Sequence, residues 1–420
     1  MRKIATLFIT LVFLAPLLAA AQVDTTQQVV PGRKNSAAAQ QKTYVILISA
    51  DGFRYDFADK YEARNLQSLR SSGVAAKNMI PSYPSLTFPN HYTIATGLYP
   101  SHHGLVDNTF YDPAKKQLYR INNRQAVEDS SWYGGTPLWV LAEQQQMLSA
   151  AFYWVGSEAA VKGVRPTYYY KYNEQIPMDE RIAIVKNWLT LPEELRPHLI
   201  AFYMPEVDHA AHYNGPDAPQ TREAVQFVDA TIGKLVRMTD SLRLPVNFIF
   251  VSDHGMTSID TVNFVATPAA ADTTRFFIPF GDELVHLYAK DKKFVKPAYK
   301  AMKKEAKEYD VYLASKTPRR WHYSAKDDRY NRIGDILLVP HWPKIFNMRN
   351  RRPNPGQHGF DNAIPDMQAS FYAWGPAFKN GLTIEAFENV HVYPLIASIL
   401  GLNITEKIDG RPEVLKPILR

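Results

Sequence analysis

The sequence predicts an α/β fold with a mostly parallel central sheet and helices on both faces. Three continuous apolar runs, over 44–49, 198–204 and 246–251, have the pattern of strands buried on both faces. Helical patterns separate these runs and lie over 61–71, 136–146, 179–191 and 220–242. Strands that alternate with helices in this way are typical of a parallel sheet.

The N-terminal 21 residues have the pattern of a secretory signal peptide. Arg2 and Lys3 precede an apolar run over 4–18, and three alanines at 19–21 form a small-residue cleavage site. This run is too short for a stable membrane span, and no later stretch is long and apolar enough to cross a bilayer. We therefore expect a protein without a membrane span that is exported, either to the periplasm or out of the cell.

The remainder of the chain is expected to form one catalytic domain over 43–420. A Gln-, Ala-, Ser- and Thr-rich stretch over 22–42 predicts a flexible leader before it. Helix 136–146 is expected to begin with a capping Thr136 and a proline in its first turn, and 150–155 is a short strand.

The pattern changes between about 257 and 355. Strands are expected over 276–288 and 335–340, around a lysine-rich helix over 292–309, and this pattern predicts a smaller inserted α+β subdomain. After the insertion a strand over 368–374 and a helix over 389–400 resume the α/β order.

Composition limits the chemistry that the chain can perform. The absence of cysteine excludes disulfides, thiolate metal sites, iron–sulfur centres and cysteine nucleophiles. Any metal must therefore be held by histidine and carboxylate side chains. The net charge of +7 suits a small anionic substrate, and we expect no stable nucleic-acid partner. The oligomeric state does not follow from the sequence.

Thr87 lies at the start of a predicted short helix that ends at Gly97. Free backbone N–H groups and the helix dipole make such a position electropositive, so a hydroxyl there could attack phosphorus as an alkoxide. The alternative is an ordinary helix N-cap, which is the common role of threonine before a helix. Thr87 by itself favours the cap.

Three aspartates follow buried strands at their C-terminal ends, namely Asp51, Asp208 and Asp253. Ligands of open α/β sheets bind in the crevice outside these ends. A single such aspartate is typical of a turn, but three of them favour a shared site.

Three histidines complete a candidate metal site. His212 lies four residues after Asp208 and thus on the same face of a helical turn, His254 is adjacent to Asp253, and His358 is flanked by small residues. Three aspartates and three histidines divided between two ions form a mixed nitrogen and oxygen ligand set that suits zinc. Two dications are the usual means of activating the attacking oxygen and holding the leaving oxygen in phosphoryl transfer.

The order and spacing of the longer motifs resemble the nucleotide pyrophosphatase/phosphodiesterase family of the alkaline phosphatase superfamily. The resemblance covers about 44–402 and rests on the motifs Pro-Ser-Leu-Thr-Phe-Pro-Asn-His-Tyr at 84–92, Thr-Gly-Leu-Tyr-Pro-Ser-His-His-Gly at 96–104, Asp208 with His212, Val-Ser-Asp-His-Gly-Met at 251–256 and His-Gly-Phe-Asp-Asn at 358–362. It implies an alkaline phosphatase-like fold and the release of nucleoside 5′-monophosphates from nucleotide phosphodiester or pyrophosphate bonds.

The resemblance also implies the role of each site residue. One Zn²⁺ is expected on Asp208, His212 and His358, and the other on Asp51, Asp253 and His254, together with Thr87. Thr87 is then the nucleophile that forms a covalent nucleotidyl-threonine.

The substrate contacts follow from the same resemblance. Asn108 matches the asparagine that donates to a non-bridging phosphate oxygen. Phe88 matches one wall of the nucleobase slot, and Tyr169 is our choice for the other wall from the tyrosine-rich run 168–172. Asn90 and His91 are expected to act as structural support.

Two alternatives remain open at this stage. The same site could serve a phosphomonoesterase or a lipid- or choline-type phosphodiesterase. A catalytically silent binding protein on the same fold is less consistent with the sequence, because Thr87 and every expected metal ligand are present.

Overall fold

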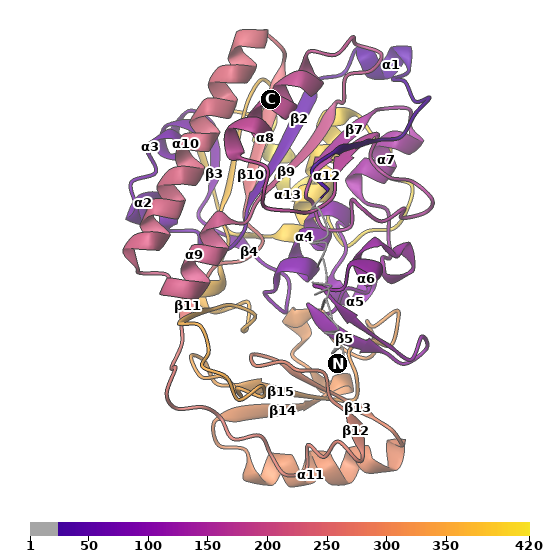
Figure 1. Cartoon of the computed structure of the whole chain (residues 1–420), viewed down its shortest axis with the longest axis vertical. Coiled ribbons are helices and arrows are strands. Elements are labelled where there is room, and N and C mark those ends of the chain that lie inside the picture. Colours follow the sequence, from indigo (N-terminus) through magenta and orange to yellow (C-terminus); the bar gives the residue numbers. More distant parts are fainter. Residues whose placement is uncertain (1–23) are drawn as a thin grey trace, which may run out of the picture.

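The structure, a computed structural model, describes residues 24–420. A large α/β body carries a smaller unit of strands and one long helix at its lower end (Figure 1). The predicted signal peptide over 1–21 lies outside the described residues.

Nine strands form the central sheet, in the order β1, β8, β7, β9, β2, β10, β17, β3 and β18. From β8 to β10 all neighbours are parallel, whereas β1 and β17 run antiparallel to the strands beside them. The sheet is therefore mostly parallel, as predicted. The bounds of its strands, in sheet order, are Gln27–Val29, Tyr168–Tyr170, Ser149–Phe152, Leu199–Met204, Tyr44–Ala50, Val246–Val251, Phe371–Trp374, Val74–Ala76 and Leu382–Ile384.

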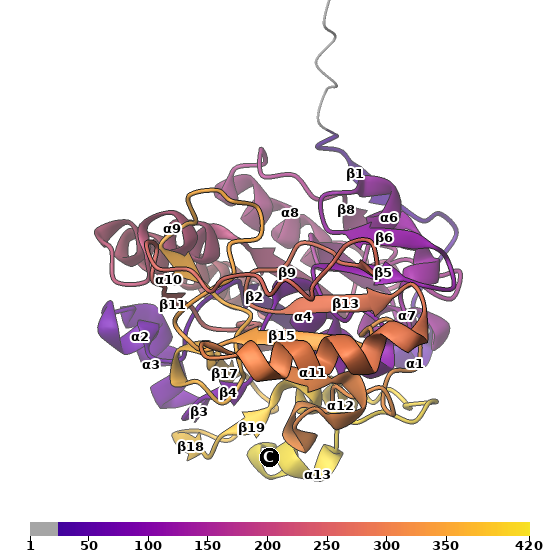
Figure 2. The ribbon, with the colours of Figure 1, turned by 90° about the horizontal axis from the view of Figure 1, so that it is seen from below.

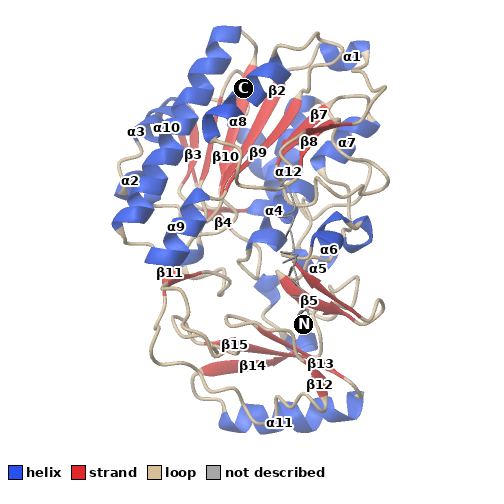
Figure 3. Cartoon of the chain, viewed as in Figure 1, coloured by secondary structure: helices blue, strands red, loops and turns tan. Residues whose placement is uncertain are grey.

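Helices cover both faces of this sheet because alternate residues of its central strands point to opposite sides. In β2, Ile46 and Ile48 belong to the core beneath α3, α8 and α10, whereas Val45 and Leu47 belong to the core beneath α4, α7 and α12. Figure 3 shows the sheet enclosed between the two sets of helices. The helices of the large body are α1 (Ala37–Gln40), α2 (Phe57–Lys60), α3 (Arg64–Ser72), α4 (Thr87–Thr96), α5 (Pro100–His103), α6 (Arg124–Glu128), α7 (Leu138–Gln144), α8 (Met178–Leu189), α9 (Glu206–Asn214), α10 (Pro219–Leu242), α12 (Val392–Leu400) and α13 (Pro412–Leu415).

The smaller unit is an antiparallel sheet with one covering helix. Its strand order is β12, β13, β15 and β14, and helix α11 (Val295–Glu305) lies across the face turned away from the large body (Figure 2). Its strands are Phe276–Phe277, Val285–Ala289, Ile336–Pro340 and Tyr309–Leu313. The expected strand 276–288 is thus two strands, and β14 forms where the lysine-rich helix was expected to end.

Three two-stranded ladders join the segments around these sheets. β11 (Thr257–Ser258) pairs with β16 (Gly356–Gln357), so the chain enters and leaves the inserted unit side by side. β5 (Thr109–Asp112) and β6 (Gln117–Arg120) form a hairpin, and β4 (Met79–Ile80) pairs with β19 (Phe387–Glu388).

Two further expectations about local structure are wrong. The described part of the leader is ordered, because β1 pairs with β8 at the sheet edge and the buried Asn35 donates to the carbonyl oxygens of Glu193 and Arg196. Thr136 does not cap α7, since its hydroxyl donates to Glu406 instead. In the part of the chain that the structure describes, no helix combines the length and the apolar character that a membrane crossing requires.

Helix α5 holds a buried neutral histidine against α4. The Nδ1 atom of His103 accepts from Leu105 N at 3.2 Å, and its Nε2 atom lies 3.0 Å from Thr93 Oγ1 and 3.2 Å from Pro89 O. Burial lowers the pKa of His103 to about 3. Protonation would place a second N–H at Nδ1, against the N–H of Leu105.

We predict that His103 makes the fold acid-sensitive. Between about pH 6.5 and pH 3 the unfolded histidine binds a proton that the folded one does not, so the free energy of unfolding falls as pH decreases. His103→Gln should remove about 1.4 kcal/mol per pH unit from this slope. Urea unfolding at pH 6, 5 and 4 would measure it, and identical slopes for the variant and the parent would contradict the prediction.

Candidate active site

Three carboxylates meet at the C-terminal edge of the parallel strands. Asp51 directly follows β2, Asp253 lies two residues after β10, and Asp208 lies in the first turn of α9, just after β9. All three are buried, with at most 8% of each residue exposed. Gly52 permits this approach, because its φ is +66° and a Cβ there would lie 3.1 Å from the Cα of Asp208.

Each carboxylate has one buried oxygen without a hydrogen-bond partner among the described residues. These atoms are Asp51 Oδ1, Asp208 Oδ1 and Asp253 Oδ2. The other oxygens are fixed in two cases, since Tyr203 donates to Asp51 Oδ2 at 2.6 Å and Gly52 N donates to Asp253 Oδ1 at 3.2 Å. Buried carboxylate oxygens without a donor are costly unless a cation compensates them, so this set fits a metal.

The three predicted histidine ligands present their Nε2 atoms to these carboxylates. The Nδ1 atoms of His212, His254 and His358 donate to the carbonyl oxygens of Gly356, Gly255 and Ser85, at 2.8, 2.8 and 2.9 Å. A neutral imidazole with its proton on Nδ1 leaves the Nε2 lone pair free, which is the usual arrangement of a metal-binding histidine.

Across the cluster, histidine Nε2 atoms face carboxylate oxygens, and both kinds of atom are acceptors without a proton between them. His254 Nε2 lies 2.9 Å from Asp253 Oδ2 and 3.5 Å from Asp51 Oδ1. His212 and His358 place their Nε2 atoms 3.4 and 3.6 Å from Asp208 Oδ1. A lone pair that faces a carboxylate oxygen at these separations suits a cation between them.

Three overlapping ligand groups have their donor atoms within 4.8 Å of one another. They are Asp208 with His212 and His358, Asp51 with Asp208 and His254, and Asp51 with His91 and Asp253. The first is identical to one predicted metal set. The members of the second predicted set, Asp51, Asp253 and His254, lie together but are divided between two groups, and the division of ligands between ions stays a prediction.

The electrostatics of the cluster favour added positive charge. Burial, followed by the charges of Asp253 and Asp208, raises the pKa of Asp51 well above its usual value. Burial, followed by the neighbouring His254 and His212, lowers the pKa of His358 well below its usual value. Burial opposes ionisation of Asp253, but the positive charges that His254 and His91 carry when they are protonated outweigh burial and lower the pKa of this carboxyl. Neutral imidazoles and ionised carboxylates are the forms that bind metal.

Thr87 is the first residue of α4 and does not cap it. The preceding Leu86 occupies the cap position, and the Thr87 hydroxyl lies 3.2 Å from His254 Nε2. The alternative role as an ordinary N-cap is therefore excluded by the geometry. The electropositive helix start and the carboxylate–histidine cluster meet at this hydroxyl.

Asn90 and His91 anchor the start of α4, which is the structural role expected for them. Asn90 accepts from Ser82 N at 2.7 Å and donates to Pro84 O and Leu86 O at 2.9 Å each. His91 lies against Thr87 O at 3.0 Å and Ser49 Oγ at 2.8 Å. His91 Nδ1 is also 3.3 Å from Asp253 Oδ2, so its ring packs against that carboxylate.

Asn108 lies beside the helix start with its amide group oriented. Its Oδ1 accepts from Phe88 N at 3.0 Å, which leaves the two N–H donors of Nδ2 available for a ligand. Phe88 is half-buried, with its ring centroid 6.3 Å from that of Tyr119.

The structure corrects the choice of Tyr169. Tyr169 lies in the middle of β8, opposite Gln28 of β1, and packs on the core. Tyr172, two residues beyond the end of β8, has its ring centroid 6.2 Å from that of Tyr203, the residue that donates to Asp51. Strand pairing thus holds Tyr169 away from the cluster, and Tyr172 is the tyrosine of this run that approaches it.

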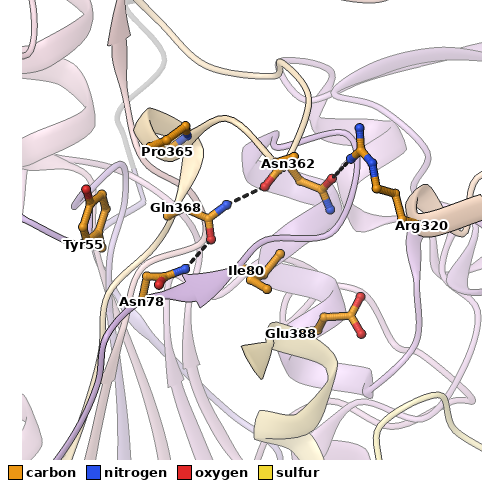
Figure 4. A pocket seen from close by; sticks show the side chains of 9 residues that line it. Tyr55, Asn78, Ile80, Arg320, Asn362, Pro365, Gln368 and Glu388 are labelled. Atoms are coloured by element: carbon orange, nitrogen blue, oxygen red, sulfur yellow. Dashed lines mark hydrogen bonds between the residues drawn. The ribbon is translucent and has the colours of Figure 1, made fainter. Parts of the chain in front are cut away.

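The loop that carries His358 is tied to the segment that precedes Thr87. Ser85 Oγ donates to Phe360 O at 2.7 Å, and Asn362 Nδ2 donates to Pro81 O at 2.9 Å. Figure 4 shows a pocket lined in part by Asn362, where Gln368 forms hydrogen bonds with Asn362 and Asn78, and Arg320 donates to Asn362. These hydrogen bonds fix the position of the His358 loop relative to the segment that precedes Thr87.

Sequence reasoning missed the residues that orient the cluster, chiefly Tyr203, Ser85 and Gln368. Tyr203 carries a recognisable signal, because it places a hydroxyl near the end of an otherwise apolar strand. Ser85 and Gln368 act through contacts with residues far away in the sequence, so no local pattern identifies them.

Comparisons with known proteins agree with this geometry. The family model described as type I phosphodiesterase/nucleotide pyrophosphatase matches residues 45–361. Mouse ectonucleotide pyrophosphatase/phosphodiesterase family member 1 is 35% identical over 381 residues, which cover 85% of this chain and 40% of that protein. An uncharacterised pyrophosphatase/phosphodiesterase of Schizosaccharomyces pombe is 34% identical over 399 residues, which cover 89% of this chain and 80% of that protein.

A solved structure has the same fold. Murine ectonucleotide pyrophosphatase/phosphodiesterase 5, in an inactive threonine-to-alanine form in complex with AMP, superposes with a TM-score of 0.84 at 28% identity. The match covers 90% of this chain and 100% of that chain. By contrast, this chain spans only 40% of the length of the mouse family member 1 protein.

We predict that His212 and not its neighbour His209 binds metal. His212→Gln should lower the metal bound per chain by about one ion, because the variant loses a nitrogen ligand. His209→Gln is the matched control, since His209 lies on the same helix with its side chain 45% exposed and faces Glu174 at 3.4 Å. Elemental analysis of the purified variants would measure both, and an equal metal content in the two would contradict the prediction.

Proposed function

Because this chain belongs to the type I phosphodiesterase/nucleotide pyrophosphatase family of the alkaline phosphatase superfamily, we propose that it is a metal-dependent phosphodiesterase of nucleotides. It hydrolyses phosphodiester or pyrophosphate bonds and releases nucleoside 5′-monophosphates. The observation that carries this proposal is the Thr87 hydroxyl, 3.2 Å from His254 Nε2 at the edge of a buried carboxylate–histidine cluster.

Thr87 is the nucleophile of the proposed reaction. The Thr87 hydroxyl loses its proton to solvent, Oγ1 forms a bond to phosphorus, the bond from phosphorus to the leaving oxygen breaks, and the leaving group departs with the electron pair. Water then attacks phosphorus and loses a proton, the bond from phosphorus to Oγ1 breaks, and Oγ1 takes up a proton to restore the hydroxyl. The inactive form of the murine relative, in which a threonine is replaced, supports this role.

The ligand cluster is proposed to hold two Zn²⁺, one on Asp208, His212 and His358, the other on Asp51, Asp253 and His254. When bound, Zn²⁺ supplies the positive charge that favours the alkoxide of Thr87 and stabilises the leaving oxygen. Three carboxylate oxygens that have no partner in the part of the chain that the structure describes, together with the free Nε2 lone pairs, support this set.

The remaining contacts position the substrate. Asn108 Nδ2 donates to a non-bridging phosphate oxygen, while its Oδ1 stays fixed on Phe88 N. Phe88 and Tyr172 bind the nucleobase by stacking. The AMP that is bound by the murine relative supports a nucleotide as the ligand of this site.

Charge favours a diester over a monoester. Two Zn²⁺ carry four positive charges, and three aspartates with a threonine alkoxide carry four negative ones, so the site is about neutral and accepts a monoanion more readily than a dianion. Lys162 and Arg165 do not supply further cations there, because Lys162 pairs with Glu406 and Arg165 donates to Glu158 O at 2.8 Å. A phosphomonoesterase or a lipid-type phosphodiesterase is the second candidate.

We propose that 43–420 acts as one exported catalytic domain with the insertion over 257–355. The pairing of β11 with β16 at the two ends of the insertion supports its bounds. The signal-like pattern over 1–21 and the ectonucleotide name of the mouse relative support export to the periplasm or beyond.

The first test compares two reporter substrates. We expect kcat/KM for para-nitrophenyl thymidine monophosphate to exceed that for para-nitrophenyl phosphate by at least about tenfold, because neither Lys162 nor Arg165 offsets the second negative charge of the monoester. Initial rates of the zinc-loaded protein would measure both. A monoester preference of about tenfold would instead favour a phosphomonoesterase.

Two variants show whether this activity belongs to the site. Thr87→Ala should lower kcat by at least about a thousandfold, whereas Thr87→Ser retains a hydroxyl and should retain much more. Full activity of Thr87→Ala would exclude the proposed nucleophile. Zinc-loaded parent protein without activity on either ester would favour a binding protein.

The second test concerns the nucleobase slot. Tyr172→Ala should raise KM for the thymidine ester by roughly tenfold through lost stacking, and Tyr172→Phe should not. Tyr169→Ala is the control from the same run, since that side chain packs on the core. An effect of Tyr169→Ala on KM as large as that of Tyr172→Ala would assign the stacking role to Tyr169 of β8 instead.

A further inference from the structure

The outermost element of the inserted unit is a lysine-rich helix. Helix α11, with the short 3₁₀ turn Lys292–Phe294 directly before it, lies across the sheet face that is turned away from the large body (Figure 2). The segment 290–307 contains eight lysines and two acidic residues, whereas the whole chain has a net charge of +7. Most of the net positive charge of the protein is therefore carried by one short segment.

The lysines of this segment occupy one exposed side of the helix. Ala298 and Met302 are buried in the core of the inserted unit, and Val295 and Tyr299 pack against that core. Exposed lysines recur at the same helical spacing on another side, and they are Lys292, Lys296, Lys300, Lys303, Lys304 and Lys307. We call these six residues the lysine face.

Ion pairs within the protein neutralise little of this charge. Lys292 pairs with Asp335 at 2.6 Å, at the start of the lysine face. Among the residues that the structure describes, no ion pair is formed by the other five lysines of the face. The nearby Glu308 is bound by Lys344 instead. The lysine face thus presents several positive charges to its surroundings.

This arrangement is unfavourable for the helix itself. Lysines four residues apart lie side by side on a helix, and like charges at that spacing repel each other. Four lysines form such a series, namely Lys292, Lys296, Lys300 and Lys304. The first turn of α11 contains no acidic residue, and Lys296 in that turn opposes the helix dipole. The lysine face therefore does not stabilise α11, and an anionic partner outside the chain would relieve the repulsion.

The composition of the segment distinguishes between classes of anionic partner. The segment 290–307 has no arginine, so it lacks the planar group that binds individual phosphates through two hydrogen bonds. Its two aromatic residues, Phe294 and Tyr299, pack on the core and offer no ring for base stacking. Hydrated ammonium groups on flexible stems suit diffuse attraction to a densely charged surface. These features favour a lipid surface over a nucleic acid.

The position of α11 suits a flat partner. The helix forms the lower end of the molecule in Figure 1, and the strands β12 to β15 lie between it and the large body. A planar surface can therefore approach along the helix. Helices α4 and α9, which carry Thr87 and Asp208, lie at the end of the large body that is nearer to the inserted unit (Figure 1). Docking through α11 would turn this end of the large body toward the surface.

We propose that the lysine face docks the protein on the surface of a membrane that carries anionic lipids. The attraction is electrostatic, with the lysine ammonium groups beside the lipid phosphates and no segment inserted across the bilayer. The inference goes beyond the proposed function and does not depend on it, because no residue of the lysine face belongs to the carboxylate–histidine cluster.

Sedimentation with vesicles tests the docking. At low ionic strength the protein should bind vesicles of equal parts phosphatidylglycerol and phosphatidylcholine, and not vesicles of phosphatidylcholine alone. Added NaCl should weaken the binding, because it screens the charges. A variant with Lys296→Gln, Lys300→Gln and Lys304→Gln should bind about a hundredfold more weakly, since each lysine near the surface contributes roughly fivefold.

The matched control carries Lys34→Gln, Lys186→Gln and Lys407→Gln. These three lysines are exposed on the large body, so both variants lose the same net charge. The control should bind within about twofold of the parent protein, because charges beyond the screening length contribute little. An equal loss in the two variants would overturn the inference and indicate attraction by overall charge. Parent protein that binds neither vesicle, or both equally, would overturn it as well.

Soluble polyglutamate separates a lipid surface from an acidic protein. Fluorescence anisotropy of the labelled polymer measures its affinity for the parent protein under the same buffer conditions. Weaker binding to polyglutamate than to the phosphatidylglycerol vesicles would support the lipid surface. Tighter binding to polyglutamate would overturn the assignment and indicate an acidic protein as the partner.

The free energy of unfolding distinguishes docking from a role in the fold. Without vesicles, the lysine-face variant should be at least as stable as the parent protein, because glutamine has a similar helix propensity and the substitutions relieve like-charge repulsion. Urea unfolding of both proteins would measure this. A less stable variant would show that the lysines support the helix and would contradict the inference.

Discussion

Three like-charged carboxylates, buried together at one edge of a parallel sheet, are the constraint on which the rest of this structure depends. Asp51, Asp208 and Asp253 each direct into the same space one oxygen that has no hydrogen-bond partner within residues 24–420. Burial, followed by the charges of Asp253 and Asp208, raises the pKa of Asp51. Such an arrangement is unfavourable unless positive charge compensates it. The histidines do not supply this charge themselves, because their Nδ1 protons are donated to carbonyl oxygens and their Nε2 lone pairs face the carboxylates. A divalent metal is the group that suits both kinds of ligand.

The surrounding structure holds this cluster in register with Thr87. Asn90 fixes the turn before α4, and His91 contacts the carbonyl oxygen of Thr87 and the carboxylate of Asp253. The His358 loop is bonded to 81–85, the segment that leads into the same helix. Because one segment supports both the proposed nucleophile and a proposed metal ligand, a displacement at either position moves the other. The inserted unit contributes in a different way, since its residues Arg349 and Arg351 line a cavity together with Asn108.

The residues of the candidate site follow largely from local patterns. A buried strand followed by aspartate is easy to recognise in the sequence, because it is a continuous apolar run that ends at a charged residue. The carboxyl ends of parallel strands then meet at one edge of the sheet for geometric reasons. The sequence was less informative where long-range pairing decided the outcome. The polar stretch before 42 contains an edge strand because β8 offers an unpaired side, and Tyr169 is held on the core because β8 pairs with β1. Thr136 does not act as the expected cap, because its hydroxyl donates to Glu406, which is 270 residues away in the sequence.

The sequence by itself determined the fold class, the identity of the candidate ligands and the position of Thr87 at a helix start. These follow from periodicity, composition and short spacings, which act over a few residues. Only the tertiary structure decided that the Thr87 hydroxyl is turned toward His254, that Tyr172 and not Tyr169 approaches the cluster, and that three arginines share a cavity with Asn108. The physical reason is that side-chain direction and charge pairing depend on contacts between segments far apart in the chain, and no local pattern encodes those contacts.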